Sequence, residues 1–213
     1  MTVGIPDDDW FIVYNKRFRE CVHQLLAWGY QDARSSIGSD TEEDAVTGYI
    51  AEAIEDRLDD LSTPPEYRIF YSIREQNRVR SKTRAGKNRK IIDIVAIYKN
   101  LPLKREFWFE AKRLRTSSFP ISQYVQAGMH RYLSGEYAAG LPEAAMVGYI
   151  QNSTFEHWVN ELERCLISDA TLRLKAALQK HLILDCLPDE WLSEHNRADG
   201  TKFSLFHIFL DCS

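Results

Sequence analysis

Long apolar runs are missing from this chain. Among its 213 residues, no stretch approaches the roughly 18 consecutive apolar residues that a membrane-spanning helix needs. The opening residues MTVGIPDDDW also lack the basic-then-apolar order of a signal peptide. We therefore expect a cytoplasmic protein that has no membrane partner.

Paired cysteines and the common nucleotide motifs are missing as well. The four cysteines, Cys21, Cys165, Cys186 and Cys212, are far apart and show no CxxC spacing, so we expect reduced thiols. An iron–sulfur cluster built from all four remains an alternative that the spacing does not support. The chain contains no glycine-rich phosphate loop and no nucleophile elbow, which argues against a small-molecule enzyme of those classes.

Bulk positive charge is lacking too, since the net charge is −4 and the isoelectric point is near 5.9. Such a chain does not coat nucleic acid through its overall charge. The segment RVRSKTRAGKNRK (78–90), however, holds seven basic residues and no acid, so the rest of the chain carries −11. A basic run of this kind is either a solvated loop or a local phosphate-binding segment.

Hydrophobic periodicity predicts a single α/β (mixed α+β) domain over residues 1–213, with no internal repeat. Helices are expected at 8–29, from about 39 or 40 to 61, and at 121–133, 154–166 and 172–180. Strands are expected at 67–75, 90–98, 105–114, 144–151, 181–187 and 202–211, with an exposed segment around Trp191, His195 and Arg197. This order predicts a mixed sheet flanked by helices, with a core at about 40–151, an N-terminal helical extension (1–38) and C-terminal helices and strands (152–213).

Three charged residues interrupt the strands RKIIDIVAIY and REFWFEAKRL. If the hairpin turns about Leu101-Pro102, paired residues have numbers that sum to 203, and Asp93 then faces Glu110. Side chains alternate along a strand, so Lys112 points to the same face as Glu110. The pattern predicts that two carboxylates and an ammonium group converge.

Two opposed carboxylates in a sheet repel each other and lose hydration unless a cation lies between them. Magnesium accepts carboxylate oxygens and activates water for attack on a phosphodiester. Lys112 could orient that water or neutralise developing charge, and a metal beside it could lower the pKa of its ammonium group. The alternative is an ordinary salt bridge between Asp93 and Lys112 at a sheet edge.

The pattern IIDIV, then FWFEAKRL, then the helix SQYVQAGMHRYL resembles the PD-(D/E)XK nuclease superfamily, with the restriction-endonuclease-like fold. The resemblance covers about residues 40–151, and Ile92 stands where the family name has proline. It implies an αβββαβ core, a site for Mg²⁺ that Mn²⁺ could also fill, and phosphodiester hydrolysis. It makes Asp93 and Glu110 metal ligands and Lys112 the catalytic lysine. Family members often add a glutamate from the preceding helix, for which Glu43 is our first choice and Glu42 and Glu52 are weaker ones.

Nucleic acid, with DNA favoured by the resemblance alone, is the expected partner. The predicted contacts are Arg84, Lys87, Arg89, Lys90, Arg113, Arg115, Gln123, Tyr124 and Gln126. Trp108 and Tyr132 could also stack bases, although core positions are the simpler interpretation. The segments RYLSGEYAAGLPEAAMVGYI and WLSEHNRADGTKFSLFHIFLD also resemble a group of small bacterial nuclease-like proteins, and this resemblance implies a restriction or anti-phage setting. The rival hypothesis is a catalytically silent nucleic-acid-binding or partner-binding module, and a homodimer or a partner protein that activates the nuclease stays open.

Overall fold

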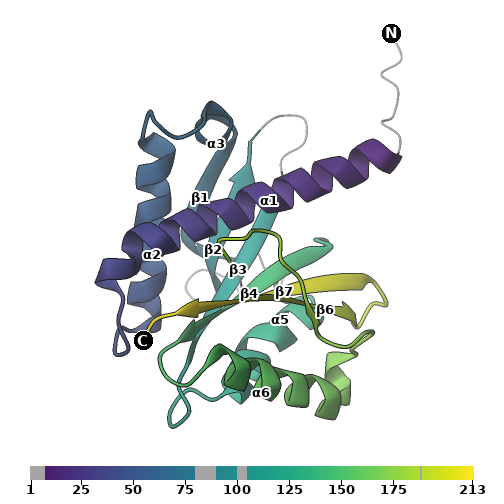
Figure 1. Cartoon of the computed structure of the whole chain (residues 1–213). Helices are drawn as coiled ribbons and strands as arrows, with labels where there is room; N and C mark the ends of the chain where they lie inside the picture. The colour runs from purple at the N-terminus through teal and green to yellow at the C-terminus, as the bar shows by residue number, and fades with distance from the viewer. Residues whose placement is uncertain (1–7, 80–89, 100–104, 188) are drawn as a thin grey trace.

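One mixed sheet organises the part of the chain that the computed structural model describes, namely residues 8–79, 90–99, 105–187 and 189–213, with side chains from residue 15 onward (Figure 1). Within it the strand order is β1-β2-β3-β4-β7-β6-β5. Neighbours are antiparallel except that β3, β4 and β7 run parallel to one another. The strands are β1 (Tyr71–Arg78), β2 (Ile91–Tyr98), β3 (Arg105–Leu114), β4 (Glu143–Ile150), β5 (Gln179–Lys180), β6 (Glu190–Asn196) and β7 (Lys202–Asp211).

Helices cover both faces of the sheet. The helical elements are α1 (Asp8–Ala33), η1 (Arg34–Ser36), α2 (Glu43–Asp59), α3 (Pro65–Phe70), α4 (Ile121–Gln123), η3 (Tyr124–Met129), α5 (His130–Leu133), α6 (Phe155–Ser168) and η4 (Ala170–Leu172). Figure 1 shows α1 and α2 on one side of the sheet and α5 and α6 on the other. No described helix is both long and apolar enough to cross a membrane.

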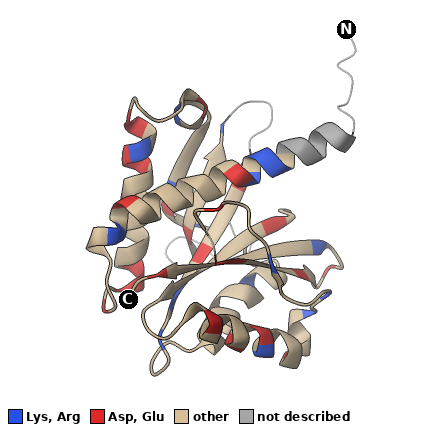
Figure 2. Ribbon diagram, viewed as in Figure 1, with Lys and Arg blue, Asp and Glu red and all other residues tan. Residues whose placement is uncertain are grey.

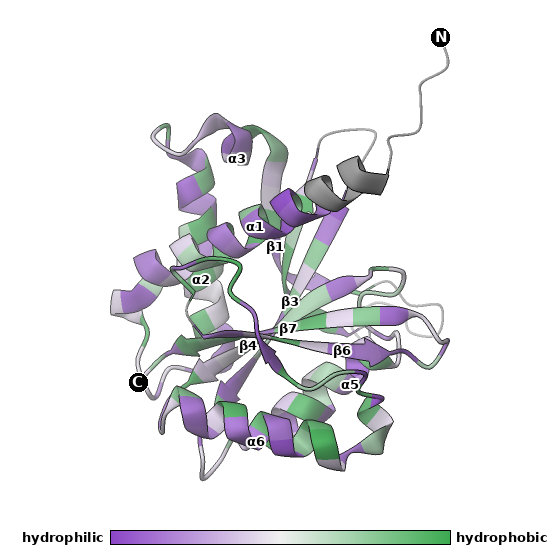
Figure 3. Cartoon of the chain, turned by 45° about the vertical axis from the view of Figure 1, so that its right-hand side comes forward, coloured by the Kyte–Doolittle hydropathy of each residue, from purple (hydrophilic) through white to green (hydrophobic). Residues whose placement is uncertain are grey.

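Alternating side chains on the central strands produce two hydrophobic clusters. Phe107 and Phe109 of β3 pack in the cluster with α1 and α2, whereas Leu114 packs in the cluster with α5 and α6. Apolar residues accordingly occupy the strands and the inner side of α6 (Figure 3), while acidic and basic residues lie along α2 and α6 (Figure 2). The sheet is therefore buried on both faces, and a charged side chain on its central strands has little access to water.

Several sequence predictions are confirmed. Strands were expected at 90–98, 105–114, 144–151 and 202–211, and β2, β3, β4 and β7 lie there within a residue. The helices expected at 8–29, 40–61, 121–133 and 154–166 also form, although a π-helical segment, η3, interrupts the third. The pairs Ile94–Phe109 and Val95–Trp108 have numbers summing to 203, so the predicted register of β2 and β3 is correct. The proposed turn at Leu101-Pro102 lies outside the described residues.

The strand expected at 67–75 begins too early. Residues 65–70 form α3 instead, because Pro65 takes the first turn of a helix, where its missing N–H leaves no donor unsatisfied. Tyr71 then starts β1, which runs to Arg78.

The predictions between residues 172 and 197 are mostly wrong. Residues 173–178 form no helix, 181–187 form no strand, and the segment expected to be exposed is β6. His195 and Arg197 are only 1% and 4% exposed. The Arg197 guanidinium lies 3.9 Å from the centre of the Phe203 ring and donates to the carbonyl groups of Tyr132, Leu141 and Ala138. The polar residues of this segment therefore belong to a buried strand and to the residue that follows it, and internal hydrogen bonds satisfy their polar groups.

A buried chain of hydrogen bonds ties this strand to η3. The Leu172 carbonyl can only accept, so His195 Nδ1 donates to it at 2.7 Å, and the neutral ring then accepts from the Ser193 hydroxyl at Nε2 (2.7 Å). Ser193 Oγ in turn accepts from His207 Nε2 (2.7 Å), which leaves His207 Nδ1 to accept from the Tyr124 hydroxyl (2.9 Å). Burial lowers the pKa of both histidines, that of His207 to about 3, which favours the neutral rings this direction requires.

We predict that Ser193→Ala lowers the free energy of unfolding by about 1–3 kcal/mol, because two buried histidine nitrogens lose their partner. Urea denaturation at neutral pH measures the change. Ser134→Ala, at an exposed serine, is the matched control and should leave stability within about 0.5 kcal/mol of the parent chain. An equal effect of both substitutions would contradict the hydrogen-bonded chain.

Candidate functional site

The sheet opens locally at Asp93. The paired positions of β2 and β3 end at Ile94–Phe109, and beyond them Asp93 Oδ2 accepts a hydrogen bond from the backbone N–H of Ala111 at 2.6 Å. On the other side of β2, the register places Gln76 opposite Asp93, and Gln76 has a φ of 43°. A positive φ is uncommon for a residue other than glycine and often marks a functional site. The backbone is thus distorted on both sides of this aspartate.

Lys112 joins the carboxylates of two layers. Its Nζ lies 2.8 Å from Glu43 Oε1 on α2 and 3.1 Å from Glu110 Oε1 on β3, and it also donates to the Ala111 carbonyl. The side chain is 14% exposed. Glu43 Oε2 accepts from the backbone N–H of Arg113 at 2.9 Å, so both oxygens of Glu43 are engaged. The ion pairs fix the lysine head group between helix and sheet.

Glu110 is the most deeply buried acid of this group. Its side chain is 2% exposed, and its Oε1 lies 3.2 Å from an Arg131 guanidinium nitrogen in addition to Lys112. Among the described residues, no donor reaches Glu110 Oε2. Burial, with the nearby charge of Asp93, raises the pKa of Glu110 to about 8. The unpaired oxygen is therefore a buried acceptor that a proton or a cation would satisfy.

Burial also raises the pKa of Asp93, to about 6, although Lys112 and the Ala111 N–H act to lower it. Burial alone would lower the pKa of Lys112, but Glu110, Asp93 and Glu43 together raise it. The three carboxylates thus favour the charged form of Lys112. A lowered pKa of Lys112 beside a bound metal stays a prediction.

The other predicted ligand, Glu43, borders the buried face of α2 as its spacing indicated, but it binds Lys112 and the backbone of β3. Glu42, a weaker choice, pairs with Arg113 and is 78% exposed in its side chain, and Glu52 is exposed. Within the residues that the structure describes, no group of three or more His, Cys, Asp or Glu side chains is placed to hold a metal ion. The structure therefore does not unite Asp93, Glu110 and Glu43 as a preformed three-carboxylate set.

The predicted nucleic-acid contacts divide into three groups. Arg84, Lys87 and Arg89 lie outside the described residues. Gln123 and Gln126 are exposed on α4 and η3, Lys90 is half-buried before β2, and Arg115 is half-buried and paired with Asp40 at 2.9 Å. Two predictions are wrong for this conformation. Tyr124 is fully buried against Phe209, and the 6% exposed Arg113 donates to Gln151 and Glu42 and lies over Phe119.

Sequence analysis missed Arg131 at this site. Arg131 donates to the Tyr137 hydroxyl at 2.7 Å as well as to Glu110, and the Tyr137 hydroxyl donates to the Ile91 carbonyl at 2.6 Å. The signal was weak but present. A charged residue within the apolar segment MHRYL of a helix that covers the sheet must find an internal partner.

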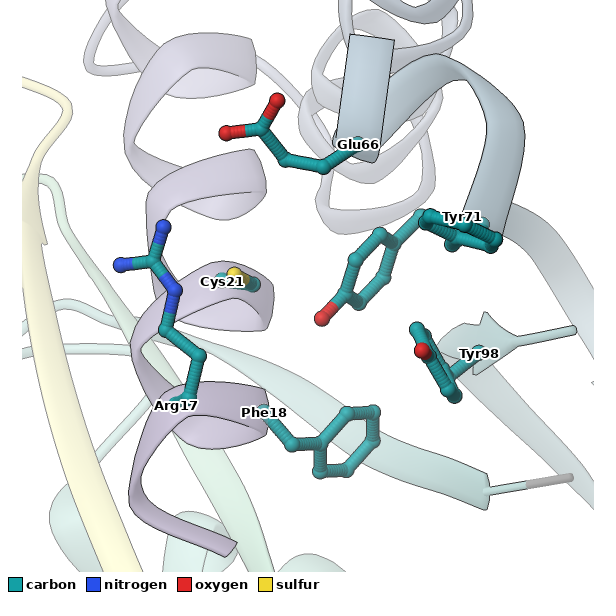
Figure 4. A pocket seen from close by; sticks show the side chains of 7 residues that line it. Arg17, Phe18, Cys21, Glu66, Tyr71 and Tyr98 are labelled. Carbon is teal, nitrogen blue, oxygen red and sulfur yellow. The ribbon is translucent and has the colours of Figure 1, made fainter. Parts of the chain in front are cut away.

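A separate cavity of about 200 Å³ lies in the layer that contains α1 (Figure 4). Aromatic rings form most of its wall, and Figure 4 shows the Cys21 thiol and Arg17 on the α1 side, across from the Tyr71 and Tyr98 rings. Its lining is Arg17, Phe18, Cys21, Glu66, Phe70, Tyr71 and Tyr98. It lacks a carboxylate pair, so it does not compete with the Asp93 region as a hydrolytic site.

We predict that Glu110 destabilises the metal-free fold as pH rises. Between the ordinary glutamate pKa of 4.5 and the value of about 8 in the fold, the unfolded chain releases this proton while the folded chain retains it. The free energy of unfolding of Glu110→Gln, minus that of the parent chain, should therefore increase by up to about 1.4 kcal/mol for each pH unit in this window. Urea denaturation with a chelator at several pH values measures the difference. A pH-independent difference for Glu110→Gln would refute the assignment.

Comparison with known proteins yields no further assignment: no family model, no curated protein and no solved structure matches this chain.

Proposed function

We propose that the chain is a metal-dependent nuclease of the restriction-endonuclease-like fold that hydrolyses phosphodiester bonds, with DNA as its first candidate substrate. The observation that carries this proposal is the group formed by Asp93, Glu110 and Lys112 where β2 and β3 diverge. A sheet buried on both faces gains no stability from a carboxylate without a partner. A catalytic role would explain why the chain keeps such a carboxylate in this sheet.

The order of elements supports the proposal. Between Glu43 and Ile150, the described residues form a helix, the short α3, three strands, a helical segment and a fourth strand. This is the αβββαβ order that the resemblance implies. The acids and the lysine occupy the second and third strands of that unit, where the resemblance expects them.

The residues fit a magnesium ion held by two carboxylates. Magnesium is commonly bound through one or two protein carboxylates, with waters and substrate phosphate completing an octahedral shell. Glu110 Oε2 is a buried acceptor with no partner in the described chain, and the nearby charge of Asp93 contributes to the raised pKa of Glu110. When bound there, the ion would supply a Lewis acid for a phosphate oxygen and increase the acidity of water.

Lys112 has the role of a fixed positive charge. Its pKa is raised, so it remains protonated and can donate to the charge that develops on phosphate. Glu43 is a positioning residue, because one oxygen binds the ammonium and the other binds the β3 backbone. Arg131 holds Glu110 from the opposite layer.

One observation favours the second candidate, a catalytically silent binding module. Lys112 and Arg131 already contact Glu110 Oε1, so the site is partly neutralised without any metal. A chain that had lost catalysis could retain such ion pairs as structure. The unpaired Glu110 Oε2 argues the other way, since a purely structural network would satisfy it.

We predict Mg²⁺-dependent cleavage of DNA that Asp93→Asn abolishes and that Lys112→Met reduces by roughly 10²–10³-fold, because each removes a charge needed in the transition state. Cleavage is measured on single- and double-stranded DNA and RNA, with Mn²⁺ as a second metal. Asp44→Asn, at an exposed position near the site, and Lys99→Met, at an exposed position just after β2, are the charge-matched controls and should cut like the parent chain.

Thermal melting supplies a readout that does not depend on activity. Mg²⁺ should raise the melting temperature of the parent chain, and this shift should disappear in Asp93→Asn. If the folded Asp93→Asn and Lys112→Met variants cut as fast as the parent chain, the site is wrongly assigned. No cleavage and no Mg²⁺ shift in a folded parent chain would favour the binding module.

A further inference from the structure

A second, larger cavity lies beside the proposed site. It measures about 400 Å³ and is built from the outer part of β1, from β3 and from the connection that follows α5. Its lining residues are Arg74, Asn77, Arg78, Val79, Glu106, Trp108, Gly135, Glu136, Ala139 and Leu141. In the described sheet β1 is an edge strand, so this part of the sheet has no further strand beside it.

The sheet register places this cavity next to the carboxylates. Arg74 pairs with Val95, and Val95 pairs with Trp108, so these three residues form one row across β1, β2 and β3. Glu110 follows Trp108 by two positions, which corresponds to about 6.8 Å along the strand and to the same sheet face. That separation is comparable to one nucleotide step along an extended strand.

A shared wall connects the two places. The Tyr137 ring packs edge-on against Trp108, with 6.4 Å between the ring centres. The Tyr137 hydroxyl accepts from Arg131, which also donates to Glu110. A ligand stacked on Trp108 would therefore be linked through Tyr137 to Arg131, the arginine that supports the proposed catalytic acid.

The lining carries two arginines and two glutamates beside Trp108, and it suits a flat, polar ligand that combines hydrogen-bond donors with a phosphate. Trp108 is half-buried, and its indole N–H donates to Glu106 at 3.2 Å, which fixes the orientation of the ring. Arg74 and Arg78 bring positive charge, and Asn77 and the two glutamates bring hydrogen-bonding groups. Aromatic rings stack on nucleobases of every sequence, and arginines bind phosphates. An apolar ligand would leave these charged groups without hydration.

We propose that this cavity holds the base of an unpaired nucleotide on Trp108, beside the phosphodiester that the Asp93–Glu110 site acts on. The inference rests on the proposed function and names its substrate class, a single-stranded or locally unpaired nucleic acid. A base stacked within a duplex cannot enter a cavity of this kind without leaving its stack. Arg74, exposed at the sheet edge, receives a neighbouring phosphate.

Fluorescence anisotropy tests the proposal with the full-length chain in a chelator, so that no metal-dependent cleavage occurs. The probes are a fluorescein-labelled thymidine oligonucleotide, its uridine RNA counterpart and a DNA duplex of the same length. Single strands should bind more tightly than the duplex. Trp108→Ala should weaken that binding by roughly 5- to 150-fold, the range measured when stacking on one base is lost.

Two variants separate stacking from folding. Trp108→Phe keeps an aromatic ring and should retain most of the affinity, and it should lose the quenching of tryptophan emission that the thymidine strand causes in the parent chain. Trp191→Ala removes a half-buried tryptophan of β6 that lies 5.9 Å from Lys180, and it should bind like the parent chain. Arg74→Ala should weaken binding and reduce its salt dependence, whereas Arg164→Ala, at the exposed arginine of α6, should not.

The outcomes distinguish this inference from the proposed function. A chain that cuts nucleic acid but binds single strands equally well with Trp108→Ala would overturn the inference and leave the nuclease intact. Tight, Trp108-dependent binding by a chain that cuts nothing would support the inference and contradict catalysis. Duplex binding as tight as single-strand binding, insensitive to Trp108, overturns the inference in either case.

Discussion

Two carboxylates buried in the middle of a sheet are the constraint around which the rest of this structure is arranged. Taking charge out of water is costly, and the cost falls only if hydrogen bonds or counter-charges replace hydration. The chain supplies both. Asp93 accepts a hydrogen bond from a backbone N–H of β3, and Glu110 forms ion pairs with Lys112 and Arg131. The divergence of β2 from β3 follows from the first of these, because the Asp93 side chain occupies a place in the ladder where a backbone acceptor would otherwise pair.

The same charges hold the layers of the fold together. Glu43 comes from α2, Lys112 and Glu110 from β3, and Arg131 from the helix on the opposite face, so a single ion-pair network passes through the sheet. Hydrophobic packing within each layer cannot fix the position of α2 relative to α5 in this way. Removing one member of such a network leaves its partners buried and unpaired, which costs more than the pair itself contributes. The site and the relative placement of the helices therefore depend on the same contacts.

The sequence could predict those features of the fold and site that depend on residues close to one another along the chain. The register of β2 and β3 depends on a short connection between two apolar strands, so simple arithmetic predicted pairs such as Ile94–Phe109 and Val95–Trp108. Helical spacing placed Glu43 at the border of the buried face of α2, but its ion pair with Lys112 was not predicted. By contrast, β6 is held by Ser193, His195 and Arg197, whose partners lie on β7, η4 and distant loops. A polar strand stabilised by non-local hydrogen bonds resembles an exposed loop when only its sequence is read. The burial of Tyr124 was missed for a similar reason, because its hydroxyl binds His207, which is distant in the sequence.

Charge counting gives the metal-free site a definite character. With Asp93, Glu110 and Glu43 ionised against Lys112 and Arg131, the group carries one net negative charge, which repels a phosphodiester. The raised pKa of Glu110 lets a proton cancel that charge near neutral pH. A divalent cation in place of the proton would instead leave the group with one positive charge, and a phosphodiester carries one negative charge. In the proposed nuclease, loss of the proton and gain of the cation would therefore be coupled, and only the cation-bound state would attract a phosphodiester.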